Sequence, residues 1–387
     1  MSYYPLSRHQ RPGRRAGPYK ILSTTNNGKM KILFISGREP SYVRNAMILK
    51  SLKKNGVEIV DCTAQSTTYP ARYLTVLTKF LLKRKDDFDL VFVGFFGQPL
   101  VPLIKKLTDK PIIFDAFLSA YDTMCFDRKI FKPDSAAGKF FYWLDRYSCE
   151  NSDRILLDTN AQIGYFVSTF GIPEDKFQRL FVGAEDFLFY PAEEITDSRQ
   201  ITVFYYSTYL PLHGTEYIIR AAGMVEQNSS IKFRIIGKGP QLKPVRRRAK
   251  MLGVANIDFV DWVPYEKLPS EIAQADICLG GHFSGIEKAG RVIAGKTYQF
   301  LAMKKPVIVG DCPANRELLT HRQNAFFVKM ADAGSLADAI LELSGDAALR
   351  KRLSEEGYKT FTEKCNTSAI GKELQKMFRS FRRQQES

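Results

Sequence analysis

The sequence predicts an α/β protein made of two doubly wound domains that face each other across a cleft. Short apolar runs alternate with helix-length segments from residue 31 to 158, which is the pattern of repeated β-α-β units. The same alternation restarts at residue 201 and continues to residue 328. A chain of 387 residues also exceeds what one hydrophobic core usually supports.

The first half begins with a strand and a helix. Lys31–Ser36 is an apolar run of the kind found in buried parallel strands, and it ends at Gly37. A helix is predicted over residues 42–54 because apolar side chains recur there at helical spacing. The further strands predicted in this half are Val57–Cys62, Leu90–Phe95, Pro111–Phe114 and Arg154–Asp158.

A polar linker separates the halves. The β-α alternation weakens over Phe189–Arg199. Within it, residues 193–198 are all acidic or hydroxyl-bearing except for one isoleucine. The strands predicted after it are Ile201–Tyr206, Ile231–Ile236, Ile257–Val260, Ile277–Leu279, Pro306–Val309 and Ala325–Val328. In doubly wound sheets the ligand binds beyond the carboxyl ends of the strands, so a cleft between two such sheets is the expected site.

Four segments are predicted from these patterns. Residues 1–29 carry six Lys or Arg and no acid, and we expect a disordered basic arm. Residues 30–192 form an N-terminal Rossmann-like domain and residues 193–365 a C-terminal one. Residues 366–387 form a helix that either returns to the N-terminal domain or joins a membrane-facing surface. The formal net charge of +16 suits an anionic partner such as a nucleotide, an acidic lipid surface or nucleic acid.

The cysteine pattern and hydropathy bear on metal content and location. The six cysteines stand singly, without a C-x-x-C motif or histidines at metal spacing, so we expect reduced thiols and no structural zinc. No stretch reaches the roughly 18 apolar residues that a membrane-spanning helix needs, and no signal-peptide core is present. These features predict a protein in the cytoplasm, either in solution or bound peripherally to the inner face of the membrane.

Three motifs between Phe204 and Pro306 are suited to phosphate binding. Each contains glycine close to an expected strand end or helix start: His213-Gly214, Gly237-Lys238-Gly239, and the segment Gly285–Lys296. A strand that runs through a glycine turn into a helix aims free backbone N–H groups and the positive end of the helix at an anion. The sequence therefore predicts a phosphate site in the second half.

The second half also resembles a known family. Ile235–Pro240, Phe259–Pro269, Ala273–Ile277 and Lys296–Ile308 together look like the C-terminal domain of retaining glycosyltransferases of family four, the glycosyl transferases group 1. The resemblance extends over most of residues 30–375 and implies the GT-B fold. It also implies transfer of a sugar from a nucleotide diphosphate sugar to an acceptor hydroxyl with retention of configuration, without a cofactor or a metal.

The resemblance places donor contacts in the turn after the first strand of the second half. The family usually has Arg and Lys-Gly against the diphosphate, whereas this chain has Thr208 and His213-Gly214. His213 is expected to donate a hydrogen bond to phosphate, or else to be a structural turn residue. Gly237 and Lys238 form the second turn, with or without nucleotide contact. Trp262 and Val263 are expected beside the base, although Trp262 alternatively fills the core.

The segment after the predicted strand Ile277–Leu279 differs further from the family pattern. Relatives often carry two glutamates eight residues apart, and the corresponding residues here are Arg291 and Gln299. Glutamine can bind ribose hydroxyls but lacks the charge-assisted bond of a carboxylate. Glu287, Lys288, Arg291 and Lys296 are candidates near the sugar and the diphosphate. The alternative is a solvated loop of mixed charge.

The first half contributes the other side of the predicted cleft. Gly37 and Arg38 follow the first strand and are expected on the acceptor side. Asp115 and Asp122 follow a later strand, at a place where many relatives have a histidine near the sugar. They either orient a hydroxyl of donor or acceptor or cap helices. The predicted catalytic set is therefore Asp115, Asp122, His213 and Lys296, with cations and helix ends stabilising the leaving diphosphate.

The acceptor and the competing functions remain open at this level. Tyr69–Lys85 combines apolar residues with a basic end, which fits a helix on an acidic membrane or an ordinary core-packed helix. In the first case the acceptor is a lipid-linked or cell-surface glycan. A nucleotide-sugar epimerase of the same fold and a pseudo-enzyme that binds the donor are alternatives. Arg246–Arg248 and the basic arm also suggest nucleic-acid binding, but no nucleic-acid-binding motif accompanies them.

Overall fold

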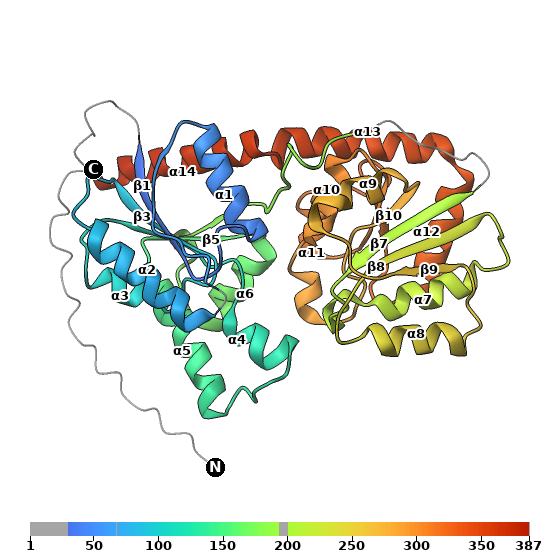
Figure 1. The fold of residues 1–387 in the computed structure, drawn as a ribbon, viewed down its shortest axis with the longest axis horizontal. Coiled ribbons are helices and arrows are strands. Elements are labelled where there is room, and N and C mark those ends of the chain that lie inside the picture. The colour runs from blue at the N-terminus through green and yellow to red at the C-terminus, as the bar shows by residue number, and fades with distance from the viewer. Residues whose placement is uncertain (1–29, 67, 193–199, 387) are drawn as a thin grey trace, which may run out of the picture.

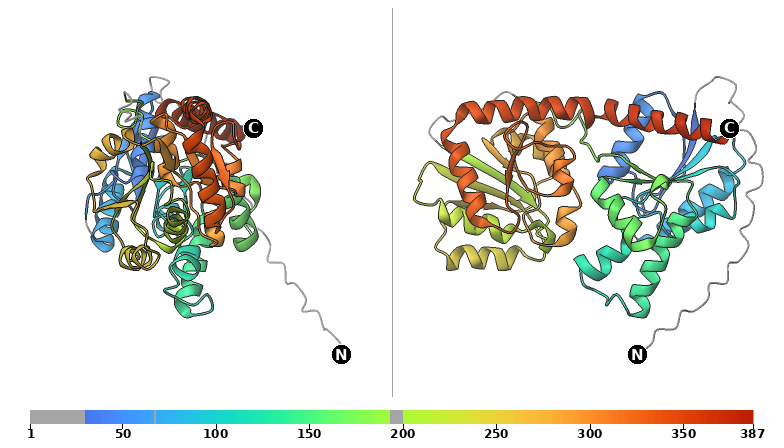
Figure 2. Two further views of the ribbon diagram at one scale, coloured as in Figure 1. Left: turned by 90° about the vertical axis from the view of Figure 1, so that its right-hand side faces the viewer. Right: turned by 180° about the vertical axis from the view of Figure 1, so that it is seen from behind.

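The protein consists of two α/β domains joined by a long C-terminal helical segment. The computed structural model describes residues 30–66, 68–192 and 200–386, so the predicted arm of residues 1–29 and most of the linker lie outside the described residues. Figure 1 shows the two domains side by side, with the last two helices along one edge of both. Seen from behind in Figure 2, the same helices again span both domains.

The N-terminal domain contains a six-stranded parallel sheet. Its strand order is β2-β1-β3-β4-β5-β6. The five predicted strands are confirmed to within one residue at each end. The sixth was not predicted, because Phe177–Arg179 has only three residues and two of them are polar. The strands are β1 (Lys31–Ser36), β2 (Glu58–Asp61), β3 (Leu90–Gly94), β4 (Ile112–Asp115), β5 (Arg154–Leu157) and β6 (Phe177–Arg179).

The C-terminal domain contains a second six-stranded parallel sheet, in the order β12-β11-β10-β7-β8-β9. All six strands were predicted to within one residue. The order reverses between β7 and β10, which is the switch point where doubly wound sheets bind ligands. The strands are β7 (Ile201–Ser207), β8 (Ile231–Gly237), β9 (Ile257–Val260), β10 (Ile277–Leu279), β11 (Val307–Gly310) and β12 (Phe326–Val328). The predicted fold class, two facing Rossmann-like domains, is confirmed.

Helices cover both sheets, as expected for parallel strands joined by crossovers. In the N-terminal half they are α1 (Val43–Lys54), α2 (Tyr69–Lys83), α3 (Val101–Lys105), α4 (Ala120–Asp122), the π-helix η1 (Thr123–Asp127), α5 (Ala136–Glu150), α6 (Asn160–Phe170) and η2 (Glu174–Lys176). In the part of the chain after residue 200 they are η3 (Pro211–His213), α7 (Thr215–Met224), α8 (Leu242–Met251), η4 (Tyr265–Lys267), α9 (Leu268–Ala273), η5 (Glu287–Gly290), α10 (Gly295–Ala302), α11 (Pro313–Arg316), α12 (Ala333–Gly345), α13 (Ala347–Lys364) and α14 (Thr367–Glu386).

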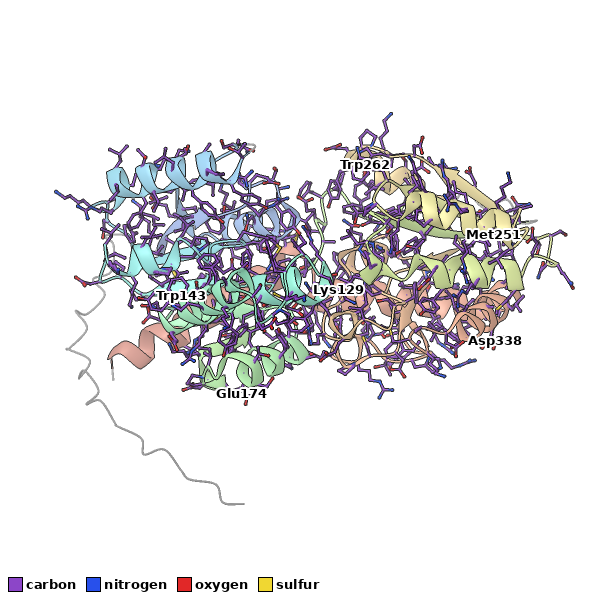
Figure 3. The ribbon with its side chains drawn as sticks, turned by 90° about the horizontal axis from the view of Figure 1, so that it is seen from below. Lys129, Trp143, Glu174, Met251, Trp262 and Asp338 are labelled. Atoms are coloured by element: carbon purple, nitrogen blue, oxygen red, sulfur yellow. The ribbon has the colours of Figure 1, made fainter. Side chains whose placement is uncertain are left out.

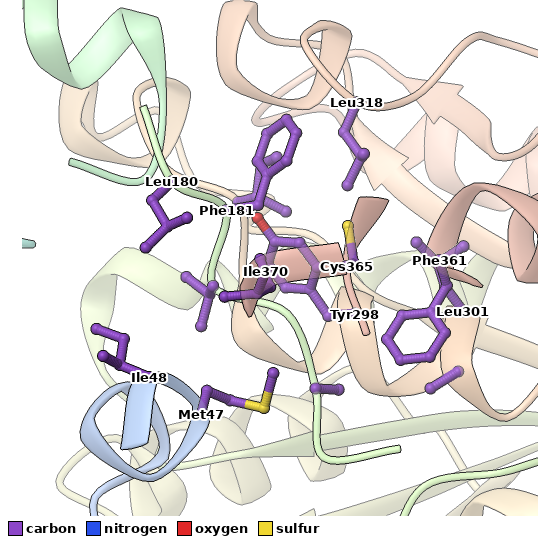
Figure 4. Packing of buried hydrophobic residues seen from close by; sticks show 14 of the residues in the cluster. Met47, Ile48, Leu180, Phe181, Tyr298, Leu301, Leu318, Phe361, Cys365 and Ile370 are labelled. Carbon is purple, nitrogen blue, oxygen red and sulfur yellow. The ribbon is translucent and has the colours of Figure 1, made fainter. Parts of the chain in front are cut away.

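One apolar cluster connects the two domains. Helix α13 contacts α10 of the C-terminal domain, whereas α14 contacts α1 of the N-terminal domain. Figure 4 shows Met47 and Ile48 of α1 in the same cluster as Tyr298 and Leu301 of α10, and Phe181 belongs to it as well. The cluster is fully or nearly fully buried, so the hydrophobic effect holds the crossing segment against both domains.

A buried ion pair lies beside this crossing. Arg44 and Asp115 have 1% and 0% of their side chains exposed, and Arg44 Nη2 lies 2.8 Å from Asp115 Oδ1. Arg44 also donates through Nη1 to the main-chain oxygens of Leu180 and Phe181, at 2.9 and 3.0 Å. Asp115 is therefore committed to a structural pair inside the domain. Asp115 was expected to orient a hydroxyl of donor or acceptor or to cap a helix, whereas in this structure both of its carboxylate oxygens accept from Arg44.

Helix α2 packs on the core through one face and exposes apolar side chains on another. Val76 and Phe80 are fully buried and pack it on the core, while Leu74 and Leu82 are 69% and 76% exposed. None of the helices in the described part of the chain has the length and apolar character needed to cross a bilayer.

Candidate functional site

The candidate site lies at the switch point of the C-terminal sheet. The loop after β7 runs from Thr208 to Gly214, and the loop after β10 begins at Gly280. The two loops leave the carboxyl ends of neighbouring strands and therefore lie side by side. The first leads into α7 and the second into α10. Neither N-cap residue makes a side-chain cap hydrogen bond within the described residues; Tyr217 N and Thr297 N donate to the main-chain oxygens of Gly214 and Ala294, and the N–H groups that precede them in each helix can face an anion.

Gly214 allows the two loops to touch. It has a φ of +66°, and a Cβ atom at this position would lie 2.3 Å from the main-chain nitrogen of Ser284. Phe283 N donates to His213 O at 3.2 Å, and Ser284 Oγ donates to Leu212 O at 2.7 Å. The approach therefore requires glycine for both conformation and space.

We expect Gly214→Ala to destabilise the protein clearly more than Gly171→Ala. Gly171 has nearly the same φ, +68°, but nothing lies within 4 Å of its missing Cβ. The Gly171 variant should lose about 1 kcal/mol of unfolding free energy from left-handed strain alone. The Gly214 variant has the added clash with Ser284. Urea unfolding of both variants measures the difference, and equal losses would contradict this account of the loop contact.

Two histidines stack at the contact of the loops. The rings of His213 and His282 lie 5.3 Å apart with an interplanar angle of 7°. Burial and the Lys296 ammonium hold the pKa of His213 well below its ordinary value, and burial lowers the pKa of His282 to about 3. Both rings are therefore neutral at physiological pH.

The contacts of His213 indicate which nitrogen carries its proton. Ser207 Oγ accepts a hydrogen bond from Tyr209 N at 2.8 Å and lies 2.7 Å from His213 Nδ1. We assign the hydroxyl proton of Ser207 to the bond with Nδ1, which leaves His213 Nε2 as an N–H donor. A neutral donor of this kind suits a phosphate oxygen.

Lys296 supplies the positive charge at this place. Its side chain is buried, and its Nζ has no hydrogen-bond partner among the described residues. The ammonium lies 4.2 Å from the centre of the Tyr205 ring. Burial lowers its pKa to about 7. His282 Nδ1 is likewise buried without a partner in the described part of the chain. An unpaired buried cation beside two neutral imidazoles and two helix N-termini is built to receive an anion.

Lys288 and Arg291 lie elsewhere, against the N-terminal domain. Lys288 Nζ contacts Thr123 Oγ1 at 2.9 Å and Asp127 Oδ2 at 3.3 Å. Arg291 Nη2 pairs with Asp122 Oδ2 at 3.0 Å, and the Asp122 side chain is only 3% exposed. Asp122 is thus an interdomain ion-pair partner in this state. Glu287, whose side chain is 91% exposed, pairs with Arg291 from the solvent side.

Gln299 occupies a buried position between two tyrosines. Its Oε1 accepts from the Tyr206 hydroxyl, and its Nε2 lies 3.0 Å from the Tyr265 hydroxyl. Both polar ends of the side chain are therefore engaged within the protein. Binding of a ribose hydroxyl by Gln299 would need one of these bonds to exchange.

The remaining donor candidates lie around the turns after β8 and β9. Gly237 and Gly239 approach Ser207 and Thr208, since Cβ atoms there would meet the main-chain oxygens of those residues at 1.9 and 1.8 Å. Trp262 is 52% exposed, which excludes the alternative that it fills the core. Lys238 Nζ lies 5.2 Å from the centre of its ring. Val263 is partly buried against the interdomain cluster.

On the N-terminal side, Gly37 and Arg38 lie at the switch point between β1 and β3. Gly37 N donates to Phe95 O at 3.1 Å, and Arg38 Nη1 donates to the Tyr69 hydroxyl at 2.8 Å. Arg38 also pairs with Glu39 at 3.1 Å. No group of three or more metal-ligating side chains gathers within residues 30–66, 68–192 and 200–386, and independence from metal remains a prediction.

Sequence reasoning named Lys296, His213 and Gly214 as candidates but did not name His282, which the structure places beside them. The signal for it was Gly280-Gly281-His282, a polar residue after two glycines at the end of a buried strand. At such an end the side chain faces the ligand crevice. The sequence also could not show that Lys288 and Arg291 face acids of the other domain.

Comparison with known proteins places these features in context. Residues 187–360 match the model of a family described as glycosyl transferases group 1. The chain is 22% identical over 293 residues to alpha-D-kanosaminyltransferase of Streptomyces kanamyceticus, covering 72% of each chain. It is similar in fold to sucrose-phosphate synthase of Thermosynechococcus elongatus, with a TM-score of 0.70, 13% identity and 91% and 99% of the two chains covered. It is also similar to HepE of Anabaena in complex with UDP, with a TM-score of 0.70, 14% identity and 91% and 100% covered.

Proposed function

We propose that the protein transfers a sugar from a nucleotide diphosphate sugar to an acceptor hydroxyl, on the premise that residues 187–360 match the model of the family described as glycosyl transferases group 1. We further propose retention of the anomeric configuration. A lipid-linked or growing glycan is the proposed acceptor, in polysaccharide or glycolipid biosynthesis.

The observation that carries this proposal is the unpaired, buried ammonium of Lys296 at the switch point. Burial of an ammonium without a partner is unfavourable. An anionic ligand bound beside Lys296 would supply the missing counter-charge. The free N-termini of α7 and α10 and the assigned Nε2–H of His213 would bind the same anion. A diphosphate, with two adjacent anionic groups, matches the spread of these donors over two loops.

These residues would also promote the reaction. The bond between the anomeric carbon and the diphosphate oxygen breaks, and negative charge grows on the leaving diphosphate. Lys296, His213 and the helix ends stabilise that charge without moving, which is the main way such preorganised sites lower a barrier. The acceptor hydroxyl attacks from the same face of the sugar, which gives retention, and its proton passes to the oxygen of the leaving diphosphate. Asp122 of the N-terminal domain would face the sugar once Arg291 releases it.

Uridine diphosphate is the first nucleotide to test. The HepE structure with UDP has the same fold over 91% of this chain. The exposed ring of Trp262, with Lys238 beside it, would stack on or flank the base. Gln299 would contact the ribose after exchanging its bond with Tyr265.

We expect UDP or a UDP-sugar to raise the melting temperature, whereas a short DNA or RNA does not. A ligand at 100 times its Kd stabilises the native state by about 2.7 kcal/mol. His213→Ala should weaken binding at least about tenfold, since it removes one hydrogen bond to a charged group. The panel includes GDP and ADP, because stabilisation by one of these instead would reassign the base.

Product analysis then separates the enzyme classes. With a suitable acceptor, NMR should show a product of the same anomeric configuration as the donor. An altered donor sugar without an acceptor would indicate an epimerase, and donor binding with no turnover across an acceptor panel would indicate a pseudo-enzyme. Stabilisation by oligonucleotides alone would overturn the proposal.

A further inference from the structure

The N-terminal end of α5 and the segment before it form a projecting surface that the proposed reaction does not use. Figure 1 shows this part extending below both domains, and both views of Figure 2 show the same projection. We call residues 126–147 the α5 tip. Figure 3 looks at the molecule from this side, with Lys129 and Trp143 labelled.

The α5 tip exposes large apolar side chains. Phe126, Ile130, Phe140 and Trp143 are 46%, 55%, 51% and 49% exposed. On α5 the ring centres of Phe140 and Trp143 lie 6.0 Å apart, and those of Trp143 and Tyr147 lie 5.1 Å apart. These side chains therefore form an aromatic stripe on the solvent side of α5. The solvent side of a helix on a protein surface is ordinarily polar.

Cations surround the apolar side chains of the α5 tip. Arg128, Lys129, Lys132 and Lys139 are exposed, and none of them has an ion-pair partner within the described residues. Of the three acids of the segment, Asp127 pairs with Lys288, Asp145 is buried and hydrogen-bonded to Ser119, and Asp134 is exposed among the cations. Apolar aromatic groups with unpaired cations around them are the composition of surfaces that insert into the headgroup region of anionic membranes.

We propose that the α5 tip docks the protein on an anionic membrane surface. Its aromatic side chains enter the interface between headgroups and acyl chains, while its lysines contact lipid phosphates. We infer a lipid surface and not a protein partner as the occupant. A protein partner would need an acidic surface hollowed to fit this convex projection, whereas an anionic membrane deforms around it.

Docking at this place also orients the reaction. Asp127 of the α5 tip contacts Lys288 of the donor-side loop, and Asp122 and Thr123, which directly precede the α5 tip, contact Arg291 and Lys288 of that loop. The donor-side loop therefore lies next to the α5 tip, so a docked protein would hold that loop close to an acceptor in the membrane. This consequence rests on the proposed function, whereas the docking itself does not.

Vesicle sedimentation of the full chain tests the proposal. We expect binding to vesicles of phosphatidylcholine with 30% phosphatidylglycerol at low salt and little binding to phosphatidylcholine alone. Lys132→Gln with Lys139→Gln should lower partitioning about 30-fold, because each lysine near an anionic surface contributes roughly fivefold. Phe140→Ser with Trp143→Ser should also lower it, through lost apolar insertion.

Matched controls identify the docking surface. Arg247→Gln with Lys250→Gln removes the same charge from exposed positions of α8, and Leu74→Ser with Leu82→Ser removes exposed apolar groups from α2. Both should bind vesicles as the wild type does. An equal loss in the α8 variant would mean that net charge alone drives binding. A loss in the α2 variant with an unchanged α5-tip variant would place the docking surface on α2, and either result overturns the proposal.

Fluorescence gives an independent readout, because the chain has only two tryptophans, Trp143 and Trp262. In a Trp262→Phe variant, emission from Trp143 should shift to shorter wavelength when anionic vesicles are added. An unchanged spectrum with bound protein would show that Trp143 stays in water, against the proposal. UDP stabilisation of the α5-tip variants should equal that of the wild type, so failure of membrane docking and failure of donor binding are distinguishable.

Discussion

Lys296→Met is expected to weaken binding of UDP or its sugars about 100-fold or more, and to lower turnover at least as much. The reason is that the variant removes the only side-chain ammonium that is buried and unpaired among the described residues of the site. Hydrogen bonds to charged groups contribute about 1.5–3 kcal/mol, and a low-dielectric site strengthens them. Calorimetric titration and the melting-temperature increase with UDP measure the loss.

The same variant should be more stable than the wild type without ligand, in a pH-dependent way. The pKa of Lys296 is lowered to about 7 in the folded protein, against 10.5 in the unfolded chain. Between these values only the unfolded chain holds the proton, so the cost of burying the charge is full below about pH 7 and fades as pH rises toward 10. The stability gain of Lys296→Met should therefore be large at pH 6 and small at pH 10.

Binding of the donor by the wild type should become weaker as pH rises. The diphosphate binds the charged ammonium, so affinity should fall as pH rises above about 7, by up to tenfold per unit until the pKa of the bound state is reached. The Lys296→Met variant should lack this dependence above pH 7. Binding of UDP by the wild type that stays constant from pH 7 to 9 would contradict the assignment.

Lys305→Met is a matched control for Lys296→Met. Lys305 is also a buried lysine of the C-terminal domain, but its Nζ donates to Ala273 O at 2.8 Å. Its replacement leaves that carbonyl oxygen without its partner and should destabilise the protein, with UDP affinity retained. If both variants lost UDP binding equally, the effect would come from general damage to the domain.

Arg44→Met is expected to cost about 3–5 kcal/mol of unfolding free energy, the second large effect. The variant leaves the Asp115 carboxylate buried without a counter-charge, and it removes the donors to the Leu180 and Phe181 oxygens. Urea unfolding measures the loss. Because these oxygens belong to the chain between the domains, the melting transition should also broaden if the domains begin to unfold separately.

Two further variants isolate the buried pair. Arg44→Met with Asp115→Leu should recover part of the loss, since the unpaired charge is gone. Arg146→Met breaks an exposed pair with Glu150 and should change the unfolding free energy by less than about 1 kcal/mol. A loss below about 1 kcal/mol for Arg44→Met alone would mean that water or a rearranged side chain already satisfies Asp115.

The sequence by itself determined the architecture and proposed the main positions of the candidate site. Buried parallel strands read as continuous apolar runs, so 11 of the 12 strands could be placed from local pattern. Glycine turns and helix starts are also local features, and they identified His213-Gly214 and Lys296. β6 escaped because a strand of three residues carries too little pattern.

Only the tertiary structure decided which of the charged candidates are free. Asp115 lies 71 residues from Arg44, and Arg291 lies 169 residues from Asp122, so no local pattern reveals that these charges are paired. The pairing of His213 with His282 depends on the contact of two loops at Gly214. A charge is available for a ligand only when no other part of the fold neutralises it. That condition depends on long-range packing, and it distinguishes Lys296 from the other cations of the segment.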